Sequence, residues 1–181
     1  QKTDIYGLNG MDRYLITTAS ALHDIGKVAI DDRILSAHDL TPEQTAILHT
    51  HPILGAQMLE NLSQYQDEPL VKFAIQICRW HHERWDGSGY PDGRKGDDIP
   101  IAAQVVALAD AYDGLTGKRD KREALSQEEA VAALTAGTHG AFNPLLLECL
   151  RDVEDRLAEE TEADAPPPPK KGILFDETVL G

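Results

Sequence analysis

The chain has 181 residues, of which 41% are hydrophobic and 27% are charged, the ordinary proportions of a folded domain with a core of its own. Its formal net charge of −14 excludes a broad, non-specific grip on a nucleic acid polymer or an anionic membrane. No apolar run reaches the roughly 18 residues of a membrane span, and no secretory signal is visible. Cys78 and Cys149 each lie in an apolar helical run, which predicts two buried thiols and a reducing compartment.

The first third of the chain predicts helices with one apolar face. Such a pattern covers residues 12–24, and Gly26 stands where this helix is expected to end. "TPEQ" at 41–44 combines an N-cap threonine, a first-turn proline and a capping-box glutamine, which marks a helix start. Pro52 predicts that this helix kinks or restarts near His51.

The middle of the chain alternates apolar helices with a turn-rich loop. A mostly apolar helix is expected over 69–82, where it reaches two adjacent histidines. "DGSGYPDG" at 86–93 cannot continue it, because its glycines, proline and acidic residues favour consecutive turns. Residues 100–115 are apolar on every side, which predicts a buried central helix.

The C-terminal part predicts two more helices and a tail. "SQEE" at 126–129 is a capping box, and "NP" at 143–144 starts a helix expected to run to about Ala158. The acidic and proline-rich stretch from residue 159 predicts a solvated, extended linker. The pattern indicates an all-α helical bundle over 1–160 and a linker and tail over 161–181.

Two aspartates at helix ends call for a positive partner. Asp110 stands near the C-terminal end of the central helix, where the helix dipole disfavours a carboxylate by about 0.3–1 kcal/mol. Burial of an unpaired charge costs several kcal/mol more. A lysine or arginine would compensate, and a metal ion would do so better. The same reasoning applies to Asp24, which follows His23 at the end of an apolar helix, whereas the similar pair His38–Asp39 lies in a polar loop.

Six such residues recur about thirty positions apart, each at or near a helix break, so that consecutive helices can aim them at one centre. They are His23, Asp24, His51, His81, His82 and Asp110. Because neighbours on a helix point about 100° apart, the adjacent pair shares a site only if the site is wide or the helix loosens there. Imidazole and carboxylate ligands suit transition metals such as Fe or Mn, and two ions about 3.5–4 Å apart suit attack on a phosphodiester.

Four motifs in this order resemble the HD-GYP domain, a bacterial branch of the HD metal-dependent phosphohydrolases that cleaves the messenger cyclic di-GMP. They are "ALHDIGK" (21–27), "HPILG" (51–55), "HHERWDGSGYPDG" (81–93) and "VVALADAYDGLT" (105–116). The resemblance runs from about Leu15 to Leu150 and implies a cytoplasmic enzyme that yields linear pGpG, GMP or both. It also implies two divalent metal ions, with three as the alternative.

The resemblance assigns roles residue by residue. The six residues named above would be metal ligands, with Asp24 bridging, and Asp24 and Lys27 would be the catalytic residues. Lys27 would lie near the substrate phosphates or support the helix end, and Gly89, Tyr90 and Pro91 would form a substrate-side loop that also contacts partners such as diguanylate cyclase, receiver or sensor domains. His49 is expected to lie on the surface, and Glu83 to fix the loop.

The basic segment "GKRDKR" at 117–122 departs from the family pattern, which has an arginine, an aromatic residue and a lysine. Here Arg119 is followed by Lys121 and Arg122, so charge is kept but a stacking ring is lost. Arg119 and Arg122 are therefore candidates for substrate phosphates, and an ordinary solvated turn is the alternative.

A second departure lies upstream, where the family has a helix with a further metal-ligating histidine. Residues 1–22 contain neither histidine nor glutamate, and the chain begins with Gln1, so we expect it to be part of a longer polypeptide. Three functions follow: a cyclic di-GMP phosphodiesterase, a module that binds a nucleotide or a cyclase partner without turnover, and an HD hydrolase with another nucleotide substrate.

Overall fold

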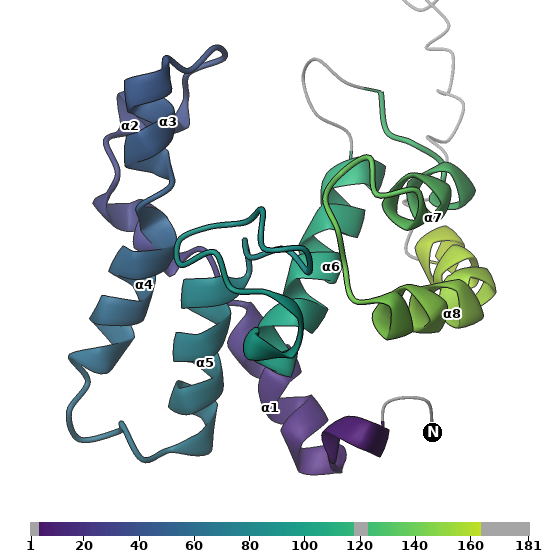
Figure 1. Cartoon of the computed structure of the whole chain (residues 1–181), viewed down its shortest axis with the longest axis horizontal. Coiled ribbons are helices and arrows are strands. Elements are labelled where there is room, and N and C mark those ends of the chain that lie inside the picture. The colour runs from purple at the N-terminus through teal and green to yellow at the C-terminus, as the bar shows by residue number, and fades with distance from the viewer. Residues whose placement is uncertain (1–3, 118–122, 164–181) are drawn as a thin grey trace, which may run out of the picture.

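The computed structural model describes residues 4–117 and 123–163 and contains only helices and loops there, which confirms the all-α prediction (Figure 1). None of the described helices combines the length and apolar character that a membrane crossing needs. The α-helices and the 3-10 helices (η) are, in chain order, η1 (Asp4–Tyr6), α1 (Gly10–Ser20), η2 (Ile25–Ala29), α2 (Asp32–Leu35), α3 (Pro42–Leu48), α4 (His51–Glu60), α5 (Pro69–Trp80), η3 (Gly96–Asp98), α6 (Ile101–Thr116), α7 (Gln127–Thr135) and α8 (Pro144–Ala163).

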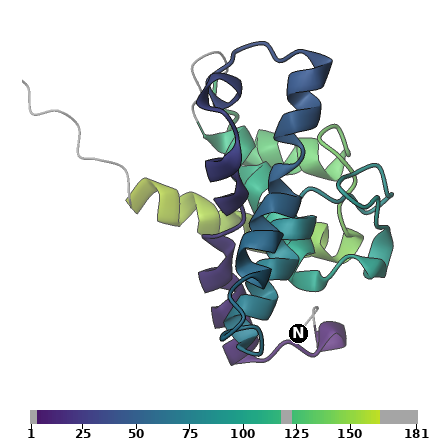
Figure 2. The same cartoon turned by 90° about the vertical axis from the view of Figure 1, so that its left-hand side faces the viewer.

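Helix α6 joins two halves of the core. One apolar cluster lies where α1, α4 and α5 meet one side of α6, and it includes Ile16, Ala56, Ile77 and Val106. The other lies between α6, α7 and α8 and includes Leu108, Leu115, Leu134 and Leu146. Figure 1 shows α6 between the α1–α4–α5 group and the α7–α8 pair, and Figure 2 shows the end of α8 projecting beyond the body. The central place predicted for this helix is confirmed.

The two capping boxes read from the sequence are confirmed, whereas Gly26, expected at the end of the first helix, lies inside η2. Thr41 and Gln44 form the reciprocal capping box of α3, and Ser126 does the same for α7 with Glu129. Helix α3 ends at Leu48 and a new helix, α4, begins at His51, as the position of Pro52 predicted.

Three expectations were wrong. The first helix ends at Ser20 and not at Asp24, because the Ser20 carbonyl accepts a hydrogen bond from the His23 backbone N–H, three residues on, and the chain then tightens into η2. The last helix continues to Ala163, since its alanines and charged residues are good helix formers and the prolines come later. Cys149 is only half-buried, because it faces an apolar surface cavity of about 350 Å³.

Candidate metal centre

A glycine contact brings Asp24 to His51. Gly26 in η2 lies so close to the start of α4 that a Cβ atom there would collide with the His51 carbonyl oxygen and reach 2.5 Å from the Gly55 nitrogen. Any larger residue would force the two segments apart. The glycines of "HDIGK" and "HPILG" therefore act together, and they fix the distance between the Asp24 carboxylate and the first turn of α4.

The end of α5 resolves the problem of the adjacent histidines. The helix closes at Trp80, His81 is its C-cap residue and His82 already belongs to the following turn. The two rings are therefore not held about 100° apart, as neighbours inside a helix would be, and their centroids lie 4.0 Å apart. Both rings also border His51, with centroid separations of 5.5 Å for His81 and 5.0 Å for His82.

Four of the six predicted ligands converge tightly. One ligand atom from each of Asp24, His51, His81 and His82 lies within 4.8 Å of all the others. The Nε2 atom of His51 is 3.2 Å from Asp24 Oδ1, and the Nε2 atom of His81 is 3.8 Å from the same oxygen. The two Nε2 atoms are 3.5 Å apart. We call these four residues the closed half of the site, because His51 and His81 are almost fully buried.

The backbone fixes which nitrogen of each ring faces the centre. His51 Nδ1 lies 2.7 Å from the Leu48 carbonyl oxygen, and His81 Nδ1 lies 3.0 Å from the carbonyl oxygens of Ile77 and Cys78. A carbonyl only accepts, so Nδ1 carries the proton of the neutral ring and donates it there. The Nε2 lone pairs then face Asp24, which is the arrangement found in histidines that bind metals.

This arrangement fits a cation. Asp24 Oδ1 is buried without a hydrogen-bond donor, and it faces two nitrogens that present lone pairs. Three electron-rich atoms in contact repel one another unless a positive charge lies among them. Burial and the neighbouring imidazoles lower the pKa of His81 to about 4 and that of His82 to about 2, so both rings stay neutral and able to ligate. The donor set suits a first-row transition metal.

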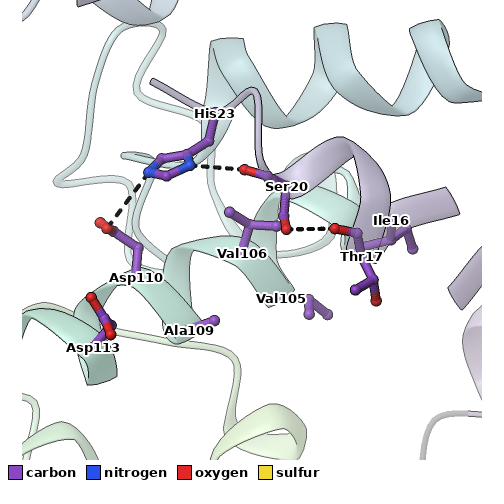
Figure 3. Close-up of a pocket in the computed structure, with 9 residues that line it drawn as sticks. All are labelled: Ile16, Thr17, Ser20, His23, Val105, Val106, Ala109, Asp110 and Asp113. Atoms are coloured by element: carbon purple, nitrogen blue, oxygen red, sulfur yellow. Dashed lines mark hydrogen bonds and ion pairs between the residues drawn. The ribbon is translucent and has the colours of Figure 1, made fainter. Parts of the chain in front are cut away.

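The other two predicted ligands form the open half of the site, which we define as His23, Asp110 and the Oδ2 atom of Asp24. His23 Nε2 lies 3.3 Å from Asp24 Oδ2 and 3.8 Å from Asp110 Oδ1, and its Nδ1 is held by the Ser20 carbonyl at 2.8 Å. The two carboxylates, Asp24 first, raise the pKa of His23. Figure 3 shows the His23 ring from the α1 side directed at Asp110 on α6.

The open half borders a cavity of about 390 Å³ between α1 and α6. Its walls are mostly apolar, with Ile16 on one side, Val105 on the other and the exposed Asp113 at the rim (Figure 3). The side chain of Asp110 is 39% exposed, so the deep burial expected from its all-apolar helix was wrong. The reason is that the face of α6 carrying Ala109 and Asp113 remains uncovered in the described part of the chain.

Lys27 binds the second oxygen of Asp24. Its Nζ donates to Asp24 Oδ2 at 2.5 Å, within the turn that carries both residues. Burial alone would raise the pKa of Asp24, but its interactions with His23, His51 and Lys27 outweigh this and hold the pKa far below the ordinary value. Asp24 is therefore ionised, with one oxygen in each half of the site.

The loop after α5 is held against the site by its backbone. A Cβ at Gly89 would collide with the His82 carbonyl and with Glu83 Cα, so only glycine lets the loop pass. The buried Glu83 carboxylate accepts hydrogen bonds from the backbone N–H groups of Asp92 and Arg94, at 2.7 and 3.0 Å. This agrees with the role of fixing the loop that the sequence suggested for Glu83.

Two contributors were missed or undervalued in the sequence. His49 is exposed, as expected, but its ring stacks on Tyr90. The predicted helix restart near His51 was the signal, because it takes His49 and His51 out of one continuous helix. Arg84 packs its guanidinium over Phe142 and donates to the carbonyl of His81, which steadies the end of α5.

Arg119 and Arg122, the candidates for binding substrate phosphates, lie outside the described residues.

The architecture and the converging side chains together define a helical domain with a histidine–aspartate cluster that could hold a metal ion. The HD domain family model matches residues 6–144, which is most of the chain, and the chain belongs to the HD domain family.

Among named relatives, the chain is 38% identical over 173 residues to a probable cyclic di-GMP phosphodiesterase of Vibrio cholerae, covering 90% of this chain and 39% of that one. It is 40% identical over 154 residues to the 3′3′-cGAMP-specific phosphodiesterase 2 of the same organism, covering 84% and 29%. The solved structure of Bd1817, an HDG"Y"P protein from Bdellovibrio bacteriovorus, matches with a TM-score of 0.61 and 25% identity, covering 85% of this chain and 48% of that one. The chain thus spans less than half the length of these proteins.

Proposed function

We propose that this domain is a metal-dependent phosphodiesterase that opens cyclic di-GMP to linear pGpG, with GMP as the product if the second bond is also cleaved. The observation that carries the proposal is the Asp24 carboxylate. One of its oxygens faces the closed half and the other faces the open half. A single bridging carboxylate between two sets of ligands, three histidines on one side and His23 with Asp110 on the other, is a layout that suits a two-metal phosphodiesterase.

We assign two divalent ions to the site, Fe or Mn by ligand chemistry, with a third ion as the alternative. His51, His81 and His82 would hold one ion, His23 and Asp110 would hold the other, and Asp24 would bridge them. When bound, the ions supply an activated water and neutralise the phosphate that is attacked. Relatives named for cyclic di-GMP and for 3′3′-cGAMP support a cyclic dinucleotide as the substrate class.

The remaining residues of the chain would orient the substrate. The Lys27 ammonium lies at the rim of Asp24, 40% exposed, where it can also meet a phosphate oxygen. The loop of Gly89, Tyr90 and Pro91 lies beside His82, and we keep it as the substrate-side wall. Arg119 and Arg122 would add positive charge for the dinucleotide in a protein that is otherwise acidic.

The proposal is tested with metal-loaded protein and two substrates. The chain, reconstituted without oxygen with Fe²⁺ or Mn²⁺, is incubated with cyclic di-GMP or with 3′3′-cGAMP, and linear products are separated by chromatography. We expect linear product from cyclic di-GMP, and none from the Asp24→Asn variant. Faster cleavage of 3′3′-cGAMP would show that this dinucleotide is the preferred substrate. Absence of linear product from both dinucleotides would contradict the proposal.

A second function, nucleotide binding without turnover, is favoured by one observation. In the described residues the open half offers only two possible ligand side chains besides the shared Asp24, namely His23 and Asp110. One side of it opens to a cavity, so a metal ion there would have few protein ligands. Tight binding of cyclic di-GMP to metal-loaded protein, with no linear product, would support that function. In either case we place the domain in the bacterial cytoplasm, where a diguanylate cyclase, receiver or sensor domain would be its partner.

A further inference from the structure

His82 is held differently from the other histidines of the site. His23, His51 and His81 each have Nδ1 fixed by a backbone carbonyl, at 2.8, 2.7 and 3.0 Å. Within the described residues, the ring of His82 makes no hydrogen bond at all. A metal-binding imidazole without such a partner can rotate, and loss of ligand orientation weakens metal binding. Something else must orient this ring.

A stack of three aromatic rings provides that orientation. The Tyr90 ring lies over His82 with a centroid distance of 4.7 Å and an angle of 23° between the planes. The His49 ring lies on Tyr90 at 3.9 Å and 12°, which is closer and more nearly parallel. His82 also meets His51 edge-on at 86°. The His82 ring is therefore confined between Tyr90 and the ring of a neighbouring ligand.

The three stacked rings come from segments that are themselves fixed. His49 caps the C-terminus of α3, where its backbone N–H bonds the Thr45 carbonyl at 2.9 Å. Tyr90 follows Gly89, whose lack of a Cβ lets the loop lie against the His82 backbone. His49 thus closes the stack from outside: among the described residues, His49 and His82 are the two rings that stack on Tyr90.

We propose that His49 is a positioning residue for the metal centre, which acts on His82 by clamping Tyr90 against it. The His49 ring does not ligate and need not ionise; what matters is that it is flat and apolar enough to stack. The inference rests on the proposed function only in that the metal held by His82 is the one used in catalysis. It also implies that Tyr90, covered on both faces, offers its edge and hydroxyl to a substrate, not a stacking face.

The test is metal affinity in three variants of the full chain. His49→Ala removes the stack, His49→Phe keeps a flat ring without the nitrogens, and His38→Ala removes an exposed histidine in the loop before α3. Mn²⁺ binding is followed by calorimetry, and Co²⁺ substitution reports ligand geometry through its visible absorption spectrum. We expect about tenfold weaker binding and an altered spectrum for His49→Ala, near-normal values for His49→Phe, and no change for His38→Ala.

Unchanged Mn²⁺ affinity and an unchanged Co²⁺ spectrum in His49→Ala would overturn the inference. So would a His49→Phe variant as weak as His49→Ala, because the imidazole and not the stacking would then matter. Tyr90→Leu, which removes the middle ring, must weaken binding at least as much as His49→Ala. These readouts need no nucleotide, so they decide the role of His49 even if cyclic di-GMP is not cleaved. Where it is cleaved, we expect kcat to fall about tenfold in His49→Ala with KM unchanged.

Discussion

The two halves of the metal site are built in opposite ways. In the closed half, the imidazoles come from the start of α4, the end of α5 and the turn after it, where His51 and His81 are almost fully buried. Close glycine contacts hold the backbone of these segments together. In the open half, His23 and Asp110 are 26% and 39% exposed, face each other across 3.8 Å and border a cavity. The closed half is preorganised for a cation before one binds. The open half has suitable ligand groups, but in the described part of the chain one of its sides opens to the cavity between α1 and α6.

This contrast assigns separate roles to the halves. A cluster of largely buried imidazoles around a carboxylate oxygen binds an ion strongly, because the ligands lose little freedom on binding. Partly exposed ligands gain less from each contact and exchange more readily with water. We therefore expect the closed half to retain its metal and the open half to load last, with Asp24 coupling the two.

Asp24→Asn should break both halves and have the largest effect. The amide loses the charge that neutralises the metal, and its NH₂ group presents donors where a cation should lie. We expect metal affinity to fall at least about a hundredfold, beyond the loss caused by removing an outer partner of a ligand. Metal content measured by mass spectrometry after gel filtration checks this. Asp39→Asn, in the second His–Asp pair of the chain, is the matched control and should bind metal normally.

Gly26→Ala should disrupt the closed half through its backbone. The added methyl group would collide with the His51 carbonyl oxygen, so η2 and α4 must separate. Overpacking of this kind costs about 1–3 kcal/mol in the free energy of unfolding, which urea denaturation of the metal-free protein measures. Gly10→Ala is the control, because a Cβ there meets only the tip of Arg13 at 3.9 Å. Equal stability of the two variants would refute the importance of the glycine contact.

The sequence predicted the closed half better than the open half, for a physical reason. Helix breaks at Pro52 and after Trp80 are local signals, and they place His51, His81 and His82 at helix ends whatever the tertiary structure. The exposure of Asp110 is not local: it depends on what covers α6 at Ala109, which periodicity alone does not show. The prediction that the first helix reaches Asp24 was wrong for the same reason: the contact of η2 with α4 is a tertiary contact, and it overrides the apolar pattern.

Asp110→Asn should separate the halves. The closed half contains no atom of Asp110, so its ion should remain, while the open half loses a charged ligand. We expect the metal content to fall from two ions to one, with the weaker ion bound about ten- to a hundredfold less tightly. Titration with Mn²⁺ followed by electron paramagnetic resonance distinguishes a coupled pair from a single ion. Loss of both ions together would mean that the two halves do not bind independently.

Lys27→Met should have the smallest effect, and it should raise the metal affinity where the other substitutions at the site lower it. The ammonium occupies Asp24 Oδ2, the oxygen that faces the open half, so removing it frees a ligand atom for metal. Because the pair is partly exposed, its worth is at most about 1 kcal/mol, which corresponds to roughly a fivefold gain in metal affinity. Calorimetric titration with Mn²⁺ measures this gain, and Lys72→Met, whose lysine pairs with the exposed Asp67, is the control. Unchanged metal affinity with a raised KM for cyclic di-GMP would instead show that the ammonium serves the substrate phosphates. The variant therefore decides between the two roles that the sequence left open for Lys27, and does so on the half of the site where the structure is least closed.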